Sequence, residues 1–282
     1  MSESDRILIL GGGGVAGIAW ATGLLTGLAD QGNDVSRAGT VIGTSAGSAV
    51  GAQLGSGLSL EELYARQVDP ALQAAEIAAE FDADAFAASF AAAYEAADSP
   101  EDQRRRLGRL ALEAKTVPEA ERRAVIVSRL PSDRWPGHRL LIVAVDAETG
   151  EPRVFDRDSG VDLVDAVTAS CAVPGIWPAA TVRGRRYTDG GVLTIDNAEL
   201  ALGRGARRVV AVLPMDPENL PRPSGTFADV VGKLRAEGAE VAVFTPDEAS
   251  LAAMGTNALD PATRAPAAEA GRAQGRAAVL PW

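Results

Sequence analysis

Residues 38–54 read AGTVIGTSAGSAVGAQL, a short apolar run, a glycine-flanked serine and a second run of small residues. The first five residues predict a buried strand and the last nine a helix. The turn between them, Gly43 to Gly47, fits the pattern Gly-x-Ser-x-Gly, whose small residues let a strand and a helix pass closely. We therefore expect Ser45 to be a nucleophile at a helix N-terminus, where free amides favour developing negative charge. The alternative is a serine that caps a helix.

A second strand-turn-helix unit precedes this one. Residues 6–10 form an apolar run typical of a buried strand, and apolar residues at helical spacing extend from Ile18 to Ala29. Between them, Gly12 to Gly17 fits Gly-x-Gly-x-x-Gly, a pattern typical of dinucleotide binding. That class of protein also needs a carboxylate at the end of the next strand, and here the serine turn occupies this place. Dinucleotide binding is therefore the less favoured interpretation.

The same glycines suit an oxyanion hole. Gly12, Gly13 and Gly14 have no Cβ atom, so their backbone amides can approach a tetrahedral intermediate and donate to its oxyanion. Each such donor contributes about 3 to 4 kcal/mol in acyl-transfer enzymes. If the two strand ends are adjacent, one supplies the nucleophile and the other the oxyanion hole.

Further apolar runs predict the rest of an α/β fold. Strands are expected at 139–145, 152–155, 207–213 and 241–245, and helices at 161–170, 197–203 and 227–237. Continuous apolar strands separated by helices indicate a mainly parallel sheet that is covered on both faces.

Two regions depart from this alternation. Residues 60–130 contain alanine-rich, charged segments such as 72–81 and 86–97, and we expect a helical insertion that acts either as scaffold or as a lid over the site. The tail at 260–282 is rich in Ala, Arg, Pro and Gly and is expected to be a loosely held helix. Residues 1–282 are nevertheless interpreted as a single domain, because that length allows one large core.

The single histidine of the chain, His138, limits the choice of a catalytic base. His138 precedes an expected strand and should lie at the amino end of the sheet, whereas Ser45 should emerge at the carboxyl ends of the strands. A carboxylate is therefore the expected base. Asp189 is the candidate, because Gly190 and Gly191 let the backbone bring its side chain into a crowded site. The alternative at these residues is a hairpin turn.

The composition restricts partners and compartment. With 27 Lys plus Arg against 38 Asp plus Glu, the formal net charge is −11, which argues against nucleic acid as a partner. The lone Cys171 cannot close an intramolecular disulfide and is expected to be a buried core residue. The acidic N-terminus lacks the features of a secretory signal, so a cytoplasmic location is expected. Residues 7–29 are uncharged over a span that could cross a bilayer, but their seven glycines argue against a transmembrane helix.

Three motifs in order carry a resemblance to a known family. Residues 12–17, 43–47 and 189–191 resemble the motifs of patatin-like phospholipases. Residues 169–178, ASCAVPGIWP, are similar to that family's Ala-Ser-x-Ala-x-Pro-Gly-x-Phe-Pro segment. The resemblance covers roughly residues 6–215 and implies a three-layer α/β/α fold.

The resemblance also implies roles for particular residues. Ser45 would be the nucleophile, Asp189 the proton acceptor and the glycine run the oxyanion hole. The glycines that support the motifs are Gly17, Gly43, Gly47, Gly190 and Gly191. One position departs from the family pattern, because Ala16 stands where many members carry Lys or Arg. This departure removes a cation near the site and leaves the amide donors unaffected.

The resulting hypothesis is a serine acyl-ester hydrolase of lipid substrates, phospholipids or lysophospholipids by what the resemblance implies. It would use a Ser–Asp dyad without metal or cofactor, act on a lipid or other acyl ester, and touch membrane surfaces transiently; the oligomeric state stays open. The alternatives are a catalytically weak regulatory or lipid-binding module on the same fold, and the less favoured dinucleotide-binding protein. Asp146 and Asp196 are interpreted as turn and helix-capping residues rather than as supports of the site.

Overall fold

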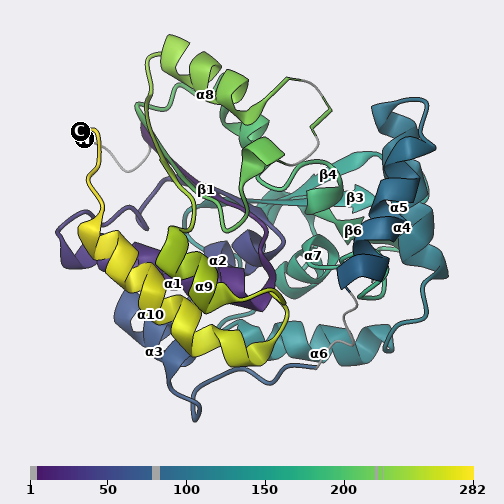
Figure 1. Ribbon diagram of the computed structural model, residues 1–282, viewed down its shortest axis with the longest axis horizontal. Helices are drawn as coiled ribbons and strands as arrows, with labels where there is room; N and C mark the ends of the chain where they lie inside the picture. Colours follow the sequence, from purple (N-terminus) through teal and green to yellow (C-terminus); the bar gives the residue numbers. More distant parts are fainter. Residues whose placement is uncertain (1–4, 78–82, 220–221, 224) are drawn as a thin grey trace.

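The computed structural model describes residues 5–77, 83–219, 222–223 and 225–282 (Figure 1). The strands are β1 Arg6–Leu10, β2 Thr40–Thr44, β3 Arg139–Asp146, β4 Pro152–Phe155, β5 Ala180–Val182, β6 Arg185–Asp189, β7 Arg208–Val212 and β8 Glu240–Phe244. The helices are α1 Gly14–Asp30, α2 Ala46–Leu54, α3 Leu60–Val68, α4 Ala83–Glu95, α5 Pro100–Glu113, α6 Glu119–Arg129, α7 Leu163–Ser170, α8 Phe227–Ala236, α9 Glu248–Met254 and α10 Arg264–Ala277.

All of these strands belong to one mixed sheet with the order β5-β6-β3-β2-β1-β7-β8, and β4 pairs with β3. The five strands from β3 to β8 along this order are parallel, whereas β4, β5 and β6 pair in antiparallel fashion. The parallel strands are short continuous apolar runs, as expected for strands that are buried on both faces. The predicted α/β fold with a mainly parallel sheet is confirmed. The strand predicted at 38–42 is observed at Thr40–Thr44, so Ser45 follows it directly.

Helices cover both faces of the sheet, which gives three layers (Figure 1). Alternate side chains of the strands point to opposite faces, so Leu140 and Ile142 of β3 join the core under α1, α2 and α7, and Leu141 joins the core under α8. Near the carboxyl end of β3, Val145 packs with Leu107 of α5 on the same face as α8. Side-chain burial on both faces therefore fixes the register of the central strands.

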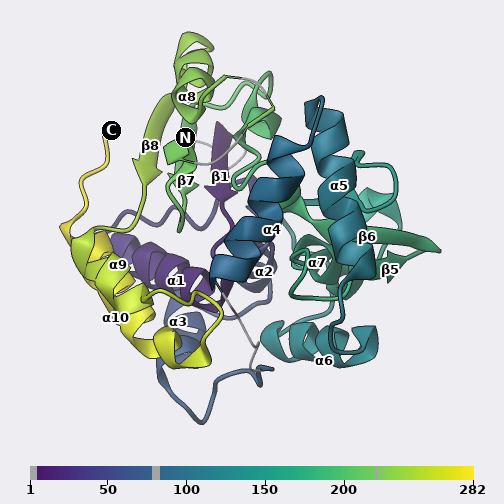
Figure 2. The same cartoon turned by 45° about the vertical axis from the view of Figure 1, so that its right-hand side comes forward.

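The region at 60–130 contains α3, α4, α5 and α6 and no strand within its described residues. The helix predicted at 86–97 is observed as α4, whereas residues 72–77 are not helical and the remainder of the predicted segment at 72–81 lies outside the described residues. In Figure 2, α4 and α5 lie side by side, and in Figure 1 both lie on the right of the molecule and α10 on the left. The helical insertion is thus confirmed for the described residues.

The tail does not behave as the loosely held segment that composition indicated. Its helix α10 packs along α1, and Ala267 and Ala268 are fully buried in that contact. Glycines on both helices allow this approach, because a Cβ atom at Gly23 would overlap the Ala268 carbonyl oxygen and one at Gly271 would overlap the Trp20 carbonyl oxygen. The helix predicted in the tail is observed as α10, but its loose attachment was wrong, because small residues that look unstructured in isolation form a close helix contact once a partner with matching glycines is present.

Replacing Gly23 with alanine is expected to destabilise the protein by about 1 to 3 kcal/mol or more, since the new methyl group has no room against α10. The matched control is Gly232→Ala in α8, where nothing lies within 4 Å of the new Cβ atom and higher helix propensity should add about 0.5 to 1 kcal/mol. Urea unfolding of both variants measures the two effects. A Gly23 variant that is as stable as the Gly232 variant would contradict the close contact between α1 and α10.

None of the helices in the described part of the chain is both long enough and apolar enough to traverse a bilayer. The uncharged stretch that begins at residue 7 is divided between β1 and α1, and α1 begins at Gly14, four residues before the predicted start.

Candidate active site

The Gly-x-Ser-x-Gly segment forms a sharp strand-to-helix turn. Ser45 lies between β2 and α2 with φ 51° and ψ −117°, a conformation that L-residues rarely adopt. Its flanking glycines are required by contact, because a Cβ atom at Gly47 would overlap the Leu10 carbonyl oxygen and one at Gly43 would come within 2.7 Å of Ser48 Cα. The strained turn therefore depends on β2 and α2 passing each other closely, as the sequence pattern predicts.

Hydrogen bonds on both sides of Ser45 hold this strained backbone. The Ser45 N–H donates to Ser170 Oγ at 3.0 Å. The Ser45 carbonyl oxygen accepts from Ser48 Oγ at 2.7 Å and from the Cys171 thiol at 3.3 Å. Strain of this kind persists only where the surroundings over-determine it, and here the end of α7 supplies two of the partners, Ser170 and Cys171.

Asp189 reaches the same place from the opposite direction. The pairing of β2 with β3 ends at Thr44 opposite Val143, and the antiparallel β6 ends with Asp189 opposite Ala144. The last residue of β6 therefore lies at the level where β2 ends and Ser45 begins. After Asp189 the chain enters a short 3₁₀ turn, Gly190–Val192, rather than a hairpin, so the hairpin alternative is wrong.

A close approach to β3 explains the glycine after Asp189. A Cβ atom at Gly190 would overlap the Val143 carbonyl oxygen. The next amide, from Gly191, donates to Asp189 Oδ1 at 2.7 Å. This hydrogen bond orients the carboxyl group, whose other oxygen, Oδ2, is buried and accepts no hydrogen bond of normal geometry from the described residues.

Burial controls the acidity of Asp189, whose side chain is only 4% exposed. Loss of hydration raises the pKa of Asp189 to about 7, and the Gly191 amide, the Ser45 side chain and the charge of Arg122 oppose this rise. An ordinary carboxylate with a pKa near 4 is a weak base, so a pKa near 7 gives Asp189 the proton affinity that general-base catalysis needs at neutral pH. Ser45, which is 8% exposed, is close enough to be one of the groups acting on this carboxyl.

The glycine run after β1 offers fewer donors than the sequence indicated. The Gly12 N–H donates to the Ile195 carbonyl oxygen at 2.9 Å, so this amide is not available to a substrate. The Gly13 and Gly14 amides precede or begin α1 and make no hydrogen bond within the described residues, as expected at a helix N-terminus. A Cβ atom at Gly14, whose φ is +63°, would come within 2.6 Å of the Ala258 carbonyl oxygen. Within the described residues, the backbone amides of Gly13 and Gly14 are therefore the ones of this run that remain available as oxyanion donors.

These groups share one apolar pocket of about 540 Å³. Ser45, Asp189, Gly13 and Gly14 lie in its wall together with hydrophobic side chains from several separate regions of the chain. The apolar lining residues include Phe86, Phe90 and Tyr94 of α4, Ile176, Val192 and Met215. A mostly hydrophobic cavity with a few convergent polar groups is typical of a small-molecule site.

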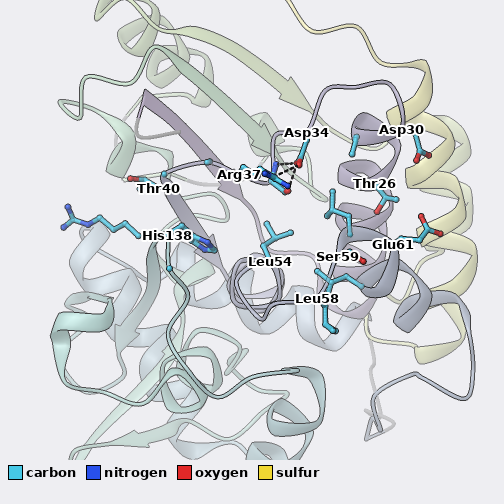
Figure 3. Close-up of a pocket in the computed structure, with 18 residues that line it drawn as sticks. Thr26, Asp30, Asp34, Arg37, Thr40, Leu54, Leu58, Ser59, Glu61 and His138 are labelled. Atoms are coloured by element: carbon cyan, nitrogen blue, oxygen red, sulfur yellow. Dashed lines mark hydrogen bonds and ion pairs between the residues drawn. The ribbon is translucent and has the colours of Figure 1, made fainter. Parts of the chain in front are cut away.

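A second, larger pocket of about 1190 Å³ lies at the other end of the sheet (Figure 3). It is lined by Thr40 and Arg139, the first residues of β2 and β3, and by His138. His138 therefore lies at the amino end of the sheet, as predicted, and not beside Ser45. Burial lowers its pKa. The charged groups here already have partners, since Asp34 pairs with Arg37 at 3.2 Å.

The remaining candidates from the sequence have structural roles. Asp146 Oδ1 accepts from the Thr149 N–H at 2.9 Å, and Asp196 Oδ1 accepts from the Ala198 N–H at 2.9 Å, which confirms both as turn or capping residues. Cys171 is 4% exposed, and burial raises the pKa of its thiol, which confirms the core assignment. No group of three or more metal-ligating side chains is found in the described part of the chain.

Residues that sequence reasoning missed also surround Ser45 and Asp189. Ser170 appeared only as a letter of a motif, and Asn197 only as the start of a predicted helix. Arg122 gave no signal, since it lies in a charged segment, yet the residue is 4% exposed and its guanidinium carbon lies 3.9 Å from the Trp177 ring centroid. Their importance depends on tertiary contacts that no local pattern encodes.

The chain is an α/β protein with three layers, α/β/α. Its apolar pocket lies at the carboxyl ends of the parallel strands, where ligands bind in open α/β folds. Within that class the chain belongs to the patatin-like phospholipase family, whose model matches residues 8–202. This match confirms the family resemblance.

Among the solved structures that are similar to the chain are VipD and ExoU. VipD from Legionella pneumophila is 12% identical with a TM-score of 0.48, and the match covers 97% of this chain and 66% of VipD. The type III effector protein ExoU is 14% identical with a TM-score of 0.32, and the match covers 98% of this chain and 54% of ExoU. The chain therefore spans less than two thirds of either. No curated protein sequence matches it.

Proposed function

We propose that this protein is a serine carboxylic ester hydrolase that cleaves acyl esters of lipids, with Ser45 and Asp189 as its catalytic dyad. The observation that carries the proposal is the convergence of a strained serine and a buried, weakly acidic aspartate in one apolar pocket. Membership of the patatin-like phospholipase family supports a lipid as the substrate class.

In the proposed mechanism, Asp189 acts as general base. As Ser45 Oγ attacks the ester carbonyl carbon, its proton moves to the Asp189 carboxylate, and the carbonyl π electrons move onto oxygen. The Gly13 and Gly14 amides stabilise that oxyanion, and the departing alcohol takes the proton from Asp189 as the tetrahedral intermediate collapses. Water then attacks the acyl-enzyme carbonyl while Asp189 again accepts a proton, and that proton passes to Ser45 Oγ as the bond to the acyl group breaks and the fatty acid leaves. No step requires a metal or a cofactor.

The hydrogen bonds around Asp189 support its role. Gly191 occupies Oδ1, so Oδ2 is the oxygen left without a partner among the described residues and is the oxygen we assign to proton transfer. A buried acceptor without a partner is costly, and a proton from the nucleophile relieves that cost in the reaction. The free amides of Gly13 and Gly14 at the pocket wall give the oxyanion a matching pair of donors.

Covalent labelling tests the proposal without knowledge of the substrate. A fluorophosphonate ester should phosphonylate Ser45, and peptide mapping by mass spectrometry should find the added mass on the peptide that contains the serine turn. Labelling should fall steeply in Asp189→Asn, because the hydroxyl loses its proton acceptor. Absence of labelling in the native protein would contradict the hydrolase and favour the regulatory or lipid-binding module.

We further propose that α4 belongs to the same domain as the sheet and forms the acyl-chain wall of the site. Phe90 lines the pocket beside Ser45 and packs with its neighbour Phe86 at a ring-centroid distance of 4.4 Å. It also contacts the buried cluster of Leu107 and Val192, which joins α4 to α5 and to the turn after Asp189. These contacts make α4 the part of the insertion that would read the acyl chain.

Phe90→Ala is expected to lower kcat/KM about tenfold for esters with long acyl chains and to change acetyl esters little, since partial loss of aromatic burial costs about 1.5 kcal/mol. Comparing a series of p-nitrophenyl esters of increasing chain length measures the effect. Leu72→Ala is the matched control, because that side chain is 46% exposed and lies outside the pocket. An equal loss at every chain length in the Phe90 variant would refute the acyl-chain wall.

A further inference from the structure

Asn197 connects the segments that carry Ser45 and Asp189. Its side-chain Nδ2 donates to Thr44 Oγ1 at 2.9 Å, to the Thr194 carbonyl oxygen at 2.7 Å and, at the longer distance of 3.3 Å, to the Gly190 carbonyl oxygen. Thr44 immediately precedes Ser45, and Gly190 immediately follows Asp189. One amide group therefore bridges the residues next to both members of the proposed dyad.

The orientation of this amide follows from its partners. The oxygens of Thr194 and Gly190 belong to backbone carbonyls, which only accept hydrogen bonds, so the atom that faces them must be the NH₂ group. Asn197 is 2% exposed, which excludes water as an easy substitute for these contacts. Its backbone is fixed as well, because the Asn197 N–H donates to Thr194 Oγ1 at 2.8 Å.

The backbone of Asn197 explains why asparagine suits this position. Its φ of 50° and ψ of 35° are left-handed, a conformation that asparagine tolerates better than most side chains. Glycine also adopts it freely, so Asn197→Gly removes the side chain without imposing backbone strain. Asn197→Asp keeps the shape of the side chain and replaces the donor group with a carboxylate oxygen.

We infer that Asn197 is a positioning residue, whose amide fixes the distance between the serine turn and the Asp189 loop so that the serine hydroxyl and the carboxylate meet. This role rests on the proposed hydrolase function. Asn197 itself is absent from the pocket wall and acts through Thr44 and Gly190. A misplacement of about 1 Å at a reacting group can cost on the order of 100-fold in rate.

Steady-state kinetics of Asn197→Gly and Asn197→Asp on a short-chain p-nitrophenyl ester test the inference. Both variants should lose about 10- to 100-fold in kcat with KM changed less than threefold, because alignment is lost and substrate binding is not. In Asn197→Asp, the added negative charge near Asp189 should move the midpoint of the pH profile to higher pH. A residue with only a structural role would lower the folded fraction and leave the kcat per folded site unchanged in both variants.

The matched control is Asn33→Gly, which removes the same side chain after α1, outside the site pocket. Amide hydrogen exchange provides a readout that needs no activity. The Gly191 and Ser45 amides should exchange at least about tenfold faster in Asn197→Gly and at the native rate in Asn33→Gly.

The outcomes separate the inference from the proposed function. Native kcat, pH midpoint and amide exchange in both Asn197 variants would overturn the positioning role while the hydrolase stands. If the native protein neither turns over esters nor reacts with the fluorophosphonate, the hydrolase fails. The exchange rates of the Gly191 and Ser45 amides then still decide whether Asn197 joins the two segments.

Discussion

Replacing Ser45 with alanine is expected to reduce kcat/KM for acyl esters by about 10⁴-fold or more and to abolish fluorophosphonate labelling. The reason is that Oγ is the only atom at the apex of the turn that can form the acyl-enzyme. Activity that remains should come from the oxyanion donors and substrate binding alone. Stopped-flow or endpoint assays with an ester of defined chain length measure the loss.

The fold should survive this substitution. Ser45 is held through its backbone N–H and carbonyl oxygen, which alanine retains, so circular dichroism and the melting temperature should stay close to native. Ser56→Ala is the matched control, because Ser56 follows the far end of α2 and its hydroxyl donates to the Gln53 carbonyl oxygen. Substantial turnover in the alanine variant at native stability would remove Ser45 from the mechanism.

Much of the fold could be predicted because local chemistry dictates it. The apolar runs of β1, β2, β3 and β7 are continuous, and only strands buried on both faces need that pattern. The steric reason for Gly43 is local to β2 and α2, whereas Gly47 is required by the close approach of α2 to Leu10 of β1. For that reason the placement of Ser45 after β2 followed from the sequence alone.

The parts that could not be predicted depend on partners distant in sequence. The tail seemed loose because its alanines and glycines have no apolar pattern of their own, and they become a packing surface only against Gly23 and Gly27 of α1. Gly12 was expected to be an oxyanion donor, but Ile195, far along the chain, takes its amide. Asn197 is unremarkable in sequence because its bridge exists only after β2 and β6 have both paired with β3.

The pKa of Asp189 also depends on residues that are distant in sequence. The Asp-Gly-Gly pattern indicates where the chain can turn closely, but the pKa depends on burial, which no neighbouring residue specifies. Sequence could therefore propose the base and could not say that its pKa suits catalysis. Because Asp189 titrates near pH 7, both the activity and the stability of the protein should change with pH around that value.

Asp189→Asn is expected to lower kcat by about 10³-fold and to remove the pH dependence of the reaction. In the native protein the carboxylate form must be present to accept a proton, so kcat/KM should rise with pH through a midpoint near 7. Asparagine does not titrate, and this rising limb should disappear. A native profile that is flat between pH 5 and pH 9 would contradict Asp189 as the base.

Asp189 should also affect the free energy of unfolding, but in the opposite direction: activity rises with pH, whereas the contribution of this carboxyl to stability falls. The pKa of Asp189 is about 7 in the folded protein and near 3.8 when unfolded, so between these values the native state retains a proton that the unfolded state has lost. Its contribution to stability is therefore full below about pH 4 and is lost as the pH rises through 7. The loss amounts to a few kcal/mol at about 1.4 kcal/mol per pKa unit, and Asp189→Asn should escape it.

Chemical unfolding at pH 5 and pH 8 measures this effect. At each pH the free energy of unfolding of the native protein is subtracted from that of the variant, and the two results are compared, so any pH-independent cost of burying the new amide cancels. Relative to the native protein, Asp189→Asn should gain stability between pH 5 and pH 8. Asp146→Asn is the matched control. Burial opposes ionisation of Asp146, but hydrogen bonds from Thr149 and Arg185 outweigh it and lower the pKa of this carboxyl. Asp146 is therefore ionised in both the folded and the unfolded protein at pH 5 and at pH 8, and the stability difference between its variant and the native protein should not change between these pH values. If Asp189→Asn lost activity without any gain at pH 8, the buried carboxylate would not be the strained, proton-seeking group on which the proposed mechanism depends.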